Sequence, residues 1–423
     1  MSAPRDRRKP SWILGLLLIL LLLGAVGFGG YSVLQAAFQP RMSDAKAAKE
    51  AAQAPASTPA SPDTPAQESA ADTRPEEDPA VSAQPQQPEA SRVTLMAVGD
   101  NLIHNCVYWS AETPDGGYDF SSFYDDIRPI AEQYDIACIH QETPLVKNRS
   151  LISSYPVFGT PVEVADAIAG AAFDVVTLAS NHCYDKLETG VTDTLSYFHD
   201  NFPEIITLGE YASEAESEKI PILEKNGIRI AMLNFTYGFN NSAPAQSWMV
   251  DTLFSRDTVC ARVSQAKQSA DFVIVFPHWG TEDTFSADDN QRSWAQSLAD
   301  AGADLIIGGH THTLQPVELL TASDGRDVPV YYSLGNFLSH QTEKINLLGG
   351  MASVTIVKDD SGTWAETYDL QPTVNVVLRN PETDWYSYRP MLLADYTPEL
   401  AAQNRFSECT VEAMQELYES IVG

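Results

Sequence analysis

Basic residues are few in this sequence. It has 26 lysines and arginines against 57 aspartates and glutamates, which gives a formal net charge of −31 at pH 7. A nucleic-acid-binding surface needs basic patches that meet the phosphate backbone, so this balance argues against nucleic acid as a partner. An acidic surface would also repel a polyanionic substrate over long range, unless cations neutralise the binding site locally.

Cysteine is scarce as well. The five cysteines show no paired spacing: Cys106, Cys138, Cys183, Cys260 and Cys409. In an exported domain, an odd number leaves at least one thiol free within a monomer. Cys183 adjoins a histidine, but we expect it to pack in the core rather than act as a nucleophile.

Charged residues are absent between Lys9 and Arg41, and residues 12–28 are almost wholly apolar. About 20 apolar residues are needed to span the hydrocarbon core of a bilayer. We therefore predict a single transmembrane anchor at residues 11–38.

The basic stub at residues 1–10 orients this anchor. By the positive-inside rule it stays in the cytoplasm, which leaves the rest of the chain outside the cell. A cleaved signal peptide, with Ala36-Ala37 near the cleavage site, is the alternative. The expected localisation is the cell membrane, single-pass, with the main domain extracellular.

Large apolar side chains are almost missing from residues 39–91, which are rich in Ala, Pro, Ser, Glu and Gln. Such a segment cannot bury enough surface to fold, so we predict a disordered linker. The main domain is expected at residues 92–378. Residues 379–423 are expected to form a C-terminal helical appendage.

Five short apolar runs in the main domain each end in residues of metal-ligand type. The runs cover residues 93–98, 135–139, 174–179, 271–276 and 304–307, and they lead to Asp100, to His140 and Glu142, to Asn181 and His182, to His278, and to His310 and His312. Runs of this kind fill sheets that are buried on both faces. Ligands bind at the carboxyl edge of such sheets, so we expect these side chains to converge.

The last run ends in Gly308-Gly309-His310-Thr311-His312. In an extended chain the two imidazoles point to the same side. That spacing suits two metal ions, or two contacts to one ion.

Helical patterns separate these runs, and strand patterns follow them. Helices are expected at residues 122–133, after Pro161, and at 187–199, 258–270 and 288–301. Strands are expected on both sides of the turn Asn226-Gly227, and at 328–333, 351–357 and 363–368. The pattern predicts an α/β domain with two sheets covered by helices.

Six stretches of the chain, read together, resemble one known family. They are Ala97-Val98-Gly99-Asp100, Glu142-Thr143-Pro144-Leu145, the segment 173–182, His278-Trp279-Gly280-Thr281-Glu282, the segment 302–316 and Tyr332-Ser333-Leu334-Gly335-Asn336-Phe337. In this order, over about residues 93–338, the chain resembles the CapA family of poly-gamma-glutamate or capsule biosynthesis proteins. The resemblance implies the four-layer α-β-β-α sandwich of the calcineurin-like metallophosphoesterases.

The resemblance also implies a role for each strand-end residue. Asp100 would bind a first metal ion, Glu142 would bridge to a second, and Asn181 and His278 would bind the second ion. His310 and His312 would complete the pair, and His182 would be the general acid or a donor that stabilises the transition state. Such oxygen and imidazole donors suit two divalent ions, Mn, Fe or Zn.

Three further residues have open roles. The wider superfamily has Asp-x-His at the first site, whereas Asp100 is followed by Asn101-Leu102, so His104 is a candidate substitute. His140 stands where the family often has Asn, and it is either an extra ligand or a core histidine. Asp185 suits support of a neighbouring side chain or a helix cap better than metal binding.

Together these features predict a membrane-anchored extracytoplasmic metal-dependent hydrolase of phosphoesterase type, acting in capsule or poly-gamma-glutamate biosynthesis. The expected partners are a cell-surface anionic polymer or its phosphorylated precursor, and membrane subunits of a polymer synthase. The alternative is a non-catalytic subunit of a synthase or export complex, with a structural or vestigial metal site. A third interpretation is cleavage or transfer at a glutamyl amide, because the predicted site residues are compatible with either an amide or a phosphate ester as the bond that is cleaved.

Overall fold

A computed structural model describes residues 90–380 and 385–423. The predicted cytoplasmic stub and anchor, and almost all of the predicted linker, lie outside these residues. Within the described ranges, no helix combines the length and the apolar character needed to cross a bilayer.

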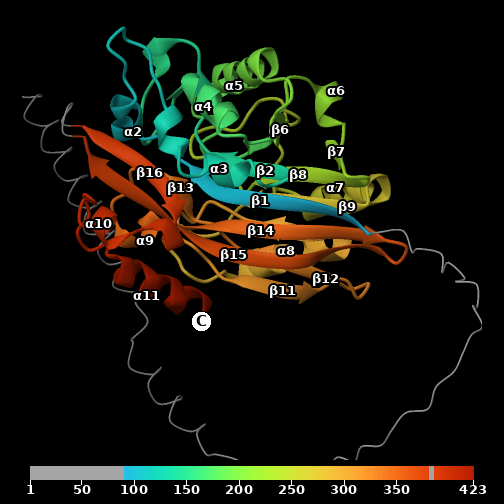
Figure 1. The fold of residues 1–423 in the computed structure, drawn as a ribbon. Coiled ribbons are helices and arrows are strands. Elements are labelled where there is room, and N and C mark those ends of the chain that lie inside the picture. The colour runs from blue at the N-terminus through green and yellow to red at the C-terminus, as the bar shows by residue number, and fades with distance from the viewer. Residues whose placement is uncertain (1–89, 381–384) are drawn as a thin grey trace, which may run out of the picture. The chain divides into compact units, whose positions relative to one another are not determined.

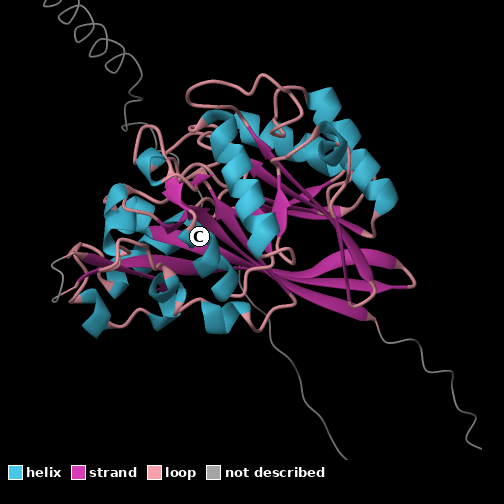
Figure 2. Cartoon of the chain, turned by 90° about the horizontal axis from the view of Figure 1, so that it is seen from above, coloured by secondary structure: helices cyan, strands magenta, loops and turns pink. Residues whose placement is uncertain are grey.

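Two sheets form the centre of the domain (Figures 1 and 2). The first has eight strands in the order β16-β15-β14-β1-β2-β5-β6, with β13 paired to β1 beside this path. Its strands are β1 (Ser91–Asn101), β2 (Ile136–Gln141), β5 (Val175–Thr177), β6 (Ile206–Leu208), β13 (Asn336–Leu338), β14 (Leu348–Asp359), β15 (Gly362–Arg379) and β16 (Tyr386–Leu392). Strands β1, β2, β5 and β6 are parallel to one another.

The second sheet has six strands in the order β11-β12-β10-β9-β8-β7. They are β7 (Ile222–Lys225), β8 (Ile228–Thr236), β9 (Phe272–His278), β10 (Leu305–Ile307), β11 (Val317–Thr321) and β12 (Asp327–Tyr331). Strands β8, β9, β10 and β12 are parallel. A separate small ladder joins β3 (Leu145–Val146) to β4 (Thr160–Pro161).

The helices vary from single turns to four turns. They are α2 (Asn105–Ser110), α3 (Arg128–Ala131), α4 (Glu163–Gly170), α5 (Leu187–Asn201), α6 (Glu214–Ser217), α7 (Arg256–Ser269), α8 (Asp289–Ala301), α9 (Lys344–Leu347), α10 (Pro398–Ala401) and α11 (Val411–Val422). Three short 3₁₀ helices are η1 (Ser121–Tyr124), η2 (Arg149–Leu151) and η3 (Leu393–Asp395).

The core consists of three apolar layers, because each sheet is covered on both faces. The middle layer lies between the two sheets and contains Cys138 of β2 and Ile274 of β9. The neighbouring Ile139 points the other way, toward α4 and α5, while Val275 points toward α7 and α8. Successive side chains of a strand face opposite sides of a sheet, so continuous apolar runs fill both faces. This is the expected four-layer α-β-β-α sandwich.

Local signals place most of the predicted elements correctly. Helices α4, α5, α7 and α8 lie where the sequence predicts them. Asp288 caps α8 through the backbone N–H of Gln291, whose side chain accepts in return from the backbone N–H of Asp288. Asn226-Gly227, both with positive φ, turns β7 into β8.

The predicted helix over residues 122–133 is wrong. The chain forms η1 and the single-turn α3 instead, and Pro129 lies in the first turn of α3. Proline has no N–H and clashes with the preceding turn, so a continuous helix cannot run through it.

The predicted helical appendage at residues 379–423 also differs from the structure. Strand β15 runs through the expected boundary to Arg379, and β16 pairs with it in antiparallel register. The helical part begins only after β16, and Met414 of α11 is fully buried against the main core. The C-terminal segment therefore contributes a strand to the eight-stranded sheet.

Candidate metal centre

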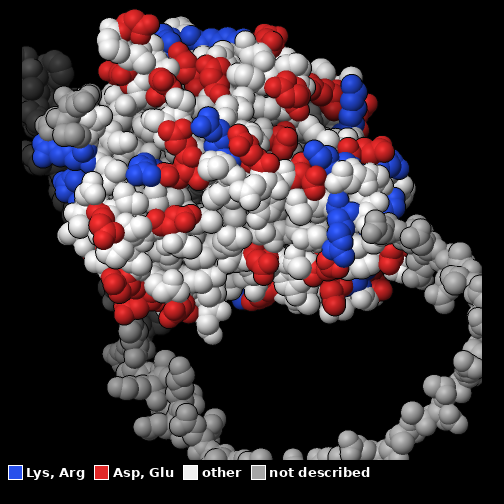
Figure 3. Space-filling model, viewed as in Figure 1, with Lys and Arg blue, Asp and Glu red and all other residues white. Residues whose placement is uncertain are grey.

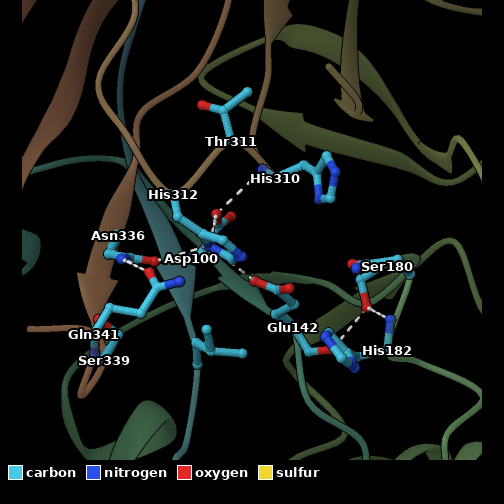
Figure 4. Close-up of polar contacts among 12 residues, drawn as sticks. Asp100, Glu142, Ser180, His182, His310, Thr311, His312, Asn336, Ser339 and Gln341 are labelled. Atoms are coloured by element: carbon cyan, nitrogen blue, oxygen red, sulfur yellow. Dashed lines mark hydrogen bonds and ion pairs between the residues drawn. The ribbon is translucent and has the colours of Figure 1, made fainter. Parts of the chain in front are cut away.

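The six predicted metal ligands lie together at the carboxyl ends of parallel strands from both sheets. Asp100 is on β1, Glu142 follows β2, Asn181 follows β5, His278 ends β9, and His310 and His312 follow β10. Each of the six is at most 3% exposed. Figure 4 shows the side chains of Asp100, Glu142 and His312 pointing toward one another. The structure therefore brings these side chains together, as the sequence predicted from their positions at strand ends.

The loop after β10 brings its two histidines close to Asp100. A Cβ on Gly309 would lie 2.7 Å from Asp100 Oδ1, so only glycine permits this approach. His310 and His312 have φ of 95° and 57°, in the left-handed region that non-glycine residues rarely adopt. The expectation of an extended His310-Thr311-His312 segment is therefore wrong.

Hydrogen bonds stabilise this unusual backbone. The N–H of His310 donates to Asp100 Oδ2 at 3.1 Å, and the amide of Asn346 donates to the carbonyl of His312 at 3.2 Å. Strained backbone of this kind persists where surrounding structure fixes it, and it clusters at functional sites.

Asp100, Glu142 and His312 form a first group of ligand atoms within reach of one ion. Nδ1 of His312 lies 3.3 Å from Asp100 Oδ2 and 3.8 Å from Glu142 Oε2. It also lies 3.1 Å from Oδ1 of Asn336.

The second group surrounds His278. Its Nε2 lies 2.8 Å from Asn181 Oδ1 and 3.9 Å from Glu142 Oε1. The rings of His278 and His310 have centroids 4.7 Å apart. Glu142 thus faces both groups, as a bridging carboxylate would.

Unpartnered polar atoms show that this site fits metal ions. In the described part of the chain, ten buried side-chain atoms lack a hydrogen-bond partner, and seven of them belong to Asp100, His140, Glu142, Asn181, His278 and His310. Both carboxylate oxygens of Glu142 are among them. Buried polar atoms without partners are costly and rare, so their concentration here indicates a ligand that completes them.

Burial and mutual charge shift the pKa values of these residues strongly. Burial raises the pKa of Glu142 well above its usual value, and the nearby carboxylate of Asp100 adds to this. Burial alone would lower the pKa of His312, but Glu142 and Asp100 outweigh it and raise the pKa to about 10. Burial lowers the pKa of His310 to about 3, helped by the charge on His312. The metal-free site therefore retains protons that divalent cations would replace.

His182 lies beside the two groups and is held by two neighbours. Its Nδ1 lies 2.7 Å from Asp185 Oδ2, and Nδ2 of Asn240 lies 3.1 Å from its Nε2. Its backbone N–H donates to Ser180 Oγ, which donates in turn to the carbonyl of Glu142 (Figure 4). Asp185 thus supports His182, and neither ligand group contains it.

The sequence analysis missed three residues on the loop after β8. Asn240 contacts His182, Asn241 donates to Asp185 Oδ1 at 2.9 Å, and the ring of Tyr237 lies 4.5 Å from that of His310. Because β8 is parallel to β9, its carboxyl end meets the same edge as the other ligands. Ligands are expected at the carboxyl ends of parallel strands, which would have indicated this loop. The sequence pattern, however, was interpreted only as a hairpin around Asn226-Gly227, without a parallel neighbour for β8.

The two additional histidine candidates, His104 and His140, have different environments in the structure. His104 belongs to neither ligand group, its Nδ1 accepts from the backbone N–H of His340, and burial lowers its pKa to about 3. His140, in contrast, forms a group with Asp100 and His278.

Comparison with known proteins agrees with this geometry. The family model of the bacterial capsule synthesis protein PGA_cap matches residues 94–341, which include all six ligands and His182. The chain belongs to this family. Membership in the PGA_cap family confirms the resemblance drawn from the sequence motifs.

Two curated relatives are similar over the same region. The chain is 31% identical over 247 residues to the PGA biosynthesis protein CapA of Bacillus subtilis (strain 168), covering 58% of this chain and 62% of that protein. It is 33% identical over 262 residues to the capsule biosynthesis protein CapA of Bacillus anthracis, covering 60% and 61%. The chain thus spans about three fifths of the length of these relatives.

Solved structures with some likeness include a calcineurin-like phosphoesterase of Bacillus subtilis, at 15% identity and a TM-score of 0.38, covering 77% of this chain and 99% of that chain. A phosphatase of Mycoplasma pneumoniae has 12% identity and a TM-score of 0.42, covering 67% and 94%. These values are too low to transfer an activity.

Proposed function

We propose that this protein is a metal-dependent hydrolase of phosphoesterase type that acts in capsule or poly-gamma-glutamate biosynthesis. The observation that carries the proposal is the bridging position of Glu142. Both of its carboxylate oxygens are buried without hydrogen-bond partners, one facing His278 and the other facing His312.

Asp100, Glu142 and His312 would hold one ion, and Glu142, Asn181, His278 and His310 the other. Mixed oxygen and imidazole donors favour Mn, Fe or Zn. Two such ions would polarise a phosphoryl oxygen and lower the pKa of a water molecule toward neutrality.

His182 would deliver a proton to the leaving oxygen from Nε2. Asp185 accepts from Nδ1, which fixes the orientation of the ring. The ring of Phe158 lies edge-on to the imidazole, with centroids 4.7 Å apart, and restricts its rotation.

The cellular location and the partners of the protein are part of the same proposal. The apolar segment at residues 11–38 would anchor the chain in the cell membrane and leave the catalytic domain outside. The partners would be an anionic surface polymer or its phosphorylated precursor, and membrane subunits of a polymer synthase. Acidic side chains are spread over the face seen in Figure 3, so bound cations would be needed for an anionic substrate to approach.

The test uses the full chain purified in detergent. Metal content is measured by mass spectrometry, and hydrolysis is followed with a synthetic phosphodiester and a phosphomonoester. We expect about two ions per chain and activity that His182→Asn lowers by about 100-fold or more without changing metal content. His199→Asn, an exposed histidine on α5, is the matched control and should behave as wild type.

A wild-type chain that binds metal but hydrolyses neither substrate, and whose biological role survives His182→Asn, would contradict the enzyme. That outcome would support a non-catalytic subunit of a synthase complex instead.

A further inference from the structure

The first ligand group lacks the second histidine that the superfamily usually has after its aspartate. Asn101 does not replace it, because its side chain is bonded elsewhere. Its Nδ2 donates to Gln141 Oε1 at 2.6 Å, and its Oδ1 accepts from the hydroxyl of Tyr124 at 3.1 Å. His104 does not replace it either, since among the described residues it belongs to neither group of ligand atoms that could hold an ion.

His140 lies close to two of the predicted ligands, Asp100 and His278. It lies on β2 two residues after Cys138, and therefore faces the space between the two sheets. Its side chain is buried, and its ring centroid lies 4.7 Å from that of His278. Asp100, His140 and His278 each offer a ligand atom, and these three atoms lie within 4.8 Å of one another.

The two ring nitrogens of His140 have different surroundings. Nδ1 lies 2.7 Å from the hydroxyl oxygen of Thr177, whereas Nε2 is buried with no partner. In the tautomer that donates Nδ1–H to Thr177, Nε2 carries a lone pair and no proton. A histidine that ligates a metal is typically held in this way, by a hydrogen bond at its other nitrogen.

A cavity of about 20 Å³ adjoins these side chains and is lined by Asp100, His140, Thr177 and His278. A space of this size holds one small ion or one water molecule. The unpartnered Oδ1 of Asp100 and Nδ1 of His278 both lie close to Gly309 in its wall.

We propose that His140 is a metal ligand of this chain, binding through Nε2 an ion within reach of Asp100 and His278. It adds an imidazole from β2 to this group. A further imidazole shifts the preference of the site toward Zn²⁺ and away from Mn²⁺. The inference rests on the proposed metal centre, and it adds a ligand and a metal preference to it.

The test measures metal binding rather than activity. The full chain is stripped with a chelator and titrated with Zn²⁺ and with Mn²⁺ by calorimetry. Loss of an outer partner of a ligand lowers metal affinity about 10- to 100-fold, and loss of a ligand should cost at least as much. We therefore expect His140→Asn to weaken Zn²⁺ binding by at least about 10-fold and Mn²⁺ binding by clearly less.

Two further variants sharpen the result. Thr177→Val leaves His140 in place but removes the acceptor for Nδ1, so a smaller loss of Zn²⁺ affinity is expected. His104→Asn removes a buried histidine outside the ligand groups, so affinity should be unchanged. The visible spectrum of the Co²⁺-loaded protein should change with His140→Asn and not with His104→Asn. Thermal melts without metal check that each variant is folded. If His140→Asn is not folded, Thr177→Val provides the test instead.

Three outcomes overturn the proposal. If the variants at 140 and 177 bind Zn²⁺ as the wild type does, His140 is a core histidine whose Nε2 meets a water molecule in the cavity. If His104→Asn alone weakens binding, the missing ligand is His104. If the wild-type chain binds no ion at all, the metal centre itself is wrong and the role of His140 is lost with it.

Discussion

Nδ1 of His182 lies 2.7 Å from Oδ2 of Asp185, and both side chains are buried. The carboxylate also accepts a hydrogen bond from the backbone N–H of Phe158 at 2.7 Å and, through its other oxygen, one from Asn241. These two hydrogen bonds hold the carboxylate of Asp185 in place, so that it can orient the imidazole of His182. This arrangement makes it a positioning residue rather than a ligand.

Asp185→Asn should lower kcat on the synthetic phosphodiester by about 10- to 1,000-fold, within the range expected for general acid–base catalysis. A neutral amide is a weaker hydrogen-bond acceptor than a carboxylate, so it would hold the imidazole less firmly in place. KM and metal content should stay close to wild type. Asp193→Asn on α5 is a suitable control, and equal losses in both variants would point to a general effect on folding.

Removing the metal should destabilise the protein, because the ions would satisfy buried atoms of Asp100, Glu142 and His310 that have no other partner. At metal concentrations about 100 to 1,000 times Kd, binding adds about 2.7 to 4.1 kcal/mol to the free energy of unfolding. The melting temperature should fall on chelation and return when Zn²⁺ or Mn²⁺ is added. An unchanged melting temperature would argue against a metal centre.

Metal binding should release protons and weaken as pH falls. In the metal-free protein the pKa of His312 is raised to about 10, and that of Glu142 is also raised by burial. His312 therefore holds a proton near neutral pH that a cation must displace. Calorimetry at pH 7 in buffers of different ionisation enthalpy should give at least one proton released per chain. The absence of any dependence on the buffer would contradict these protonation states.

Glu210→Gln should stabilise the protein at alkaline pH. Burial raises the pKa of Glu210 well above its usual value, and its Oε2 has no partner. As pH rises above the pKa in the unfolded chain, the unfolded state loses this proton while the folded state keeps it, so stability falls toward the folded pKa. Glutamine removes this penalty, because it stays neutral.

We expect the free energy of unfolding at pH 8 to rise by about 1–3 kcal/mol in Glu210→Gln, the usual cost of an unsatisfied buried polar group. At pH 4 the two proteins should unfold alike. Denaturant titrations at both pH values, with chelator present throughout, separate this effect from metal binding. A variant less stable than wild type at pH 8 would contradict this penalty and would point to the contact between Glu210 and Cys183 as the larger effect.

The C-terminal region shows where local patterns were insufficient. Residues 386–392 form β16 only because β15 extends to Arg379 and presents a free edge to pair with. The helices that follow, α10 and α11, agree with the helical character predicted for this segment. Strand pairing over this range depends on the neighbouring strand, which composition alone does not reveal.

The sequence by itself determined the five strands that carry the site, the order of α4, α5, α7 and α8, and the kind of residue at each of those strand ends. These depend on the spacing of apolar side chains and on the chemistry of Asp, Glu, Asn and His, which are local properties. Only the tertiary structure decided which of those side chains meet. A register shift between Val98 and Asp100, where β1 pairs with β2, sets the direction of Asp100, and alternation along β2 turns His140 toward His278. The register of a strand and the direction of its side chains depend on pairing with segments that are distant in the sequence. They therefore cannot be predicted from a single stretch of sequence.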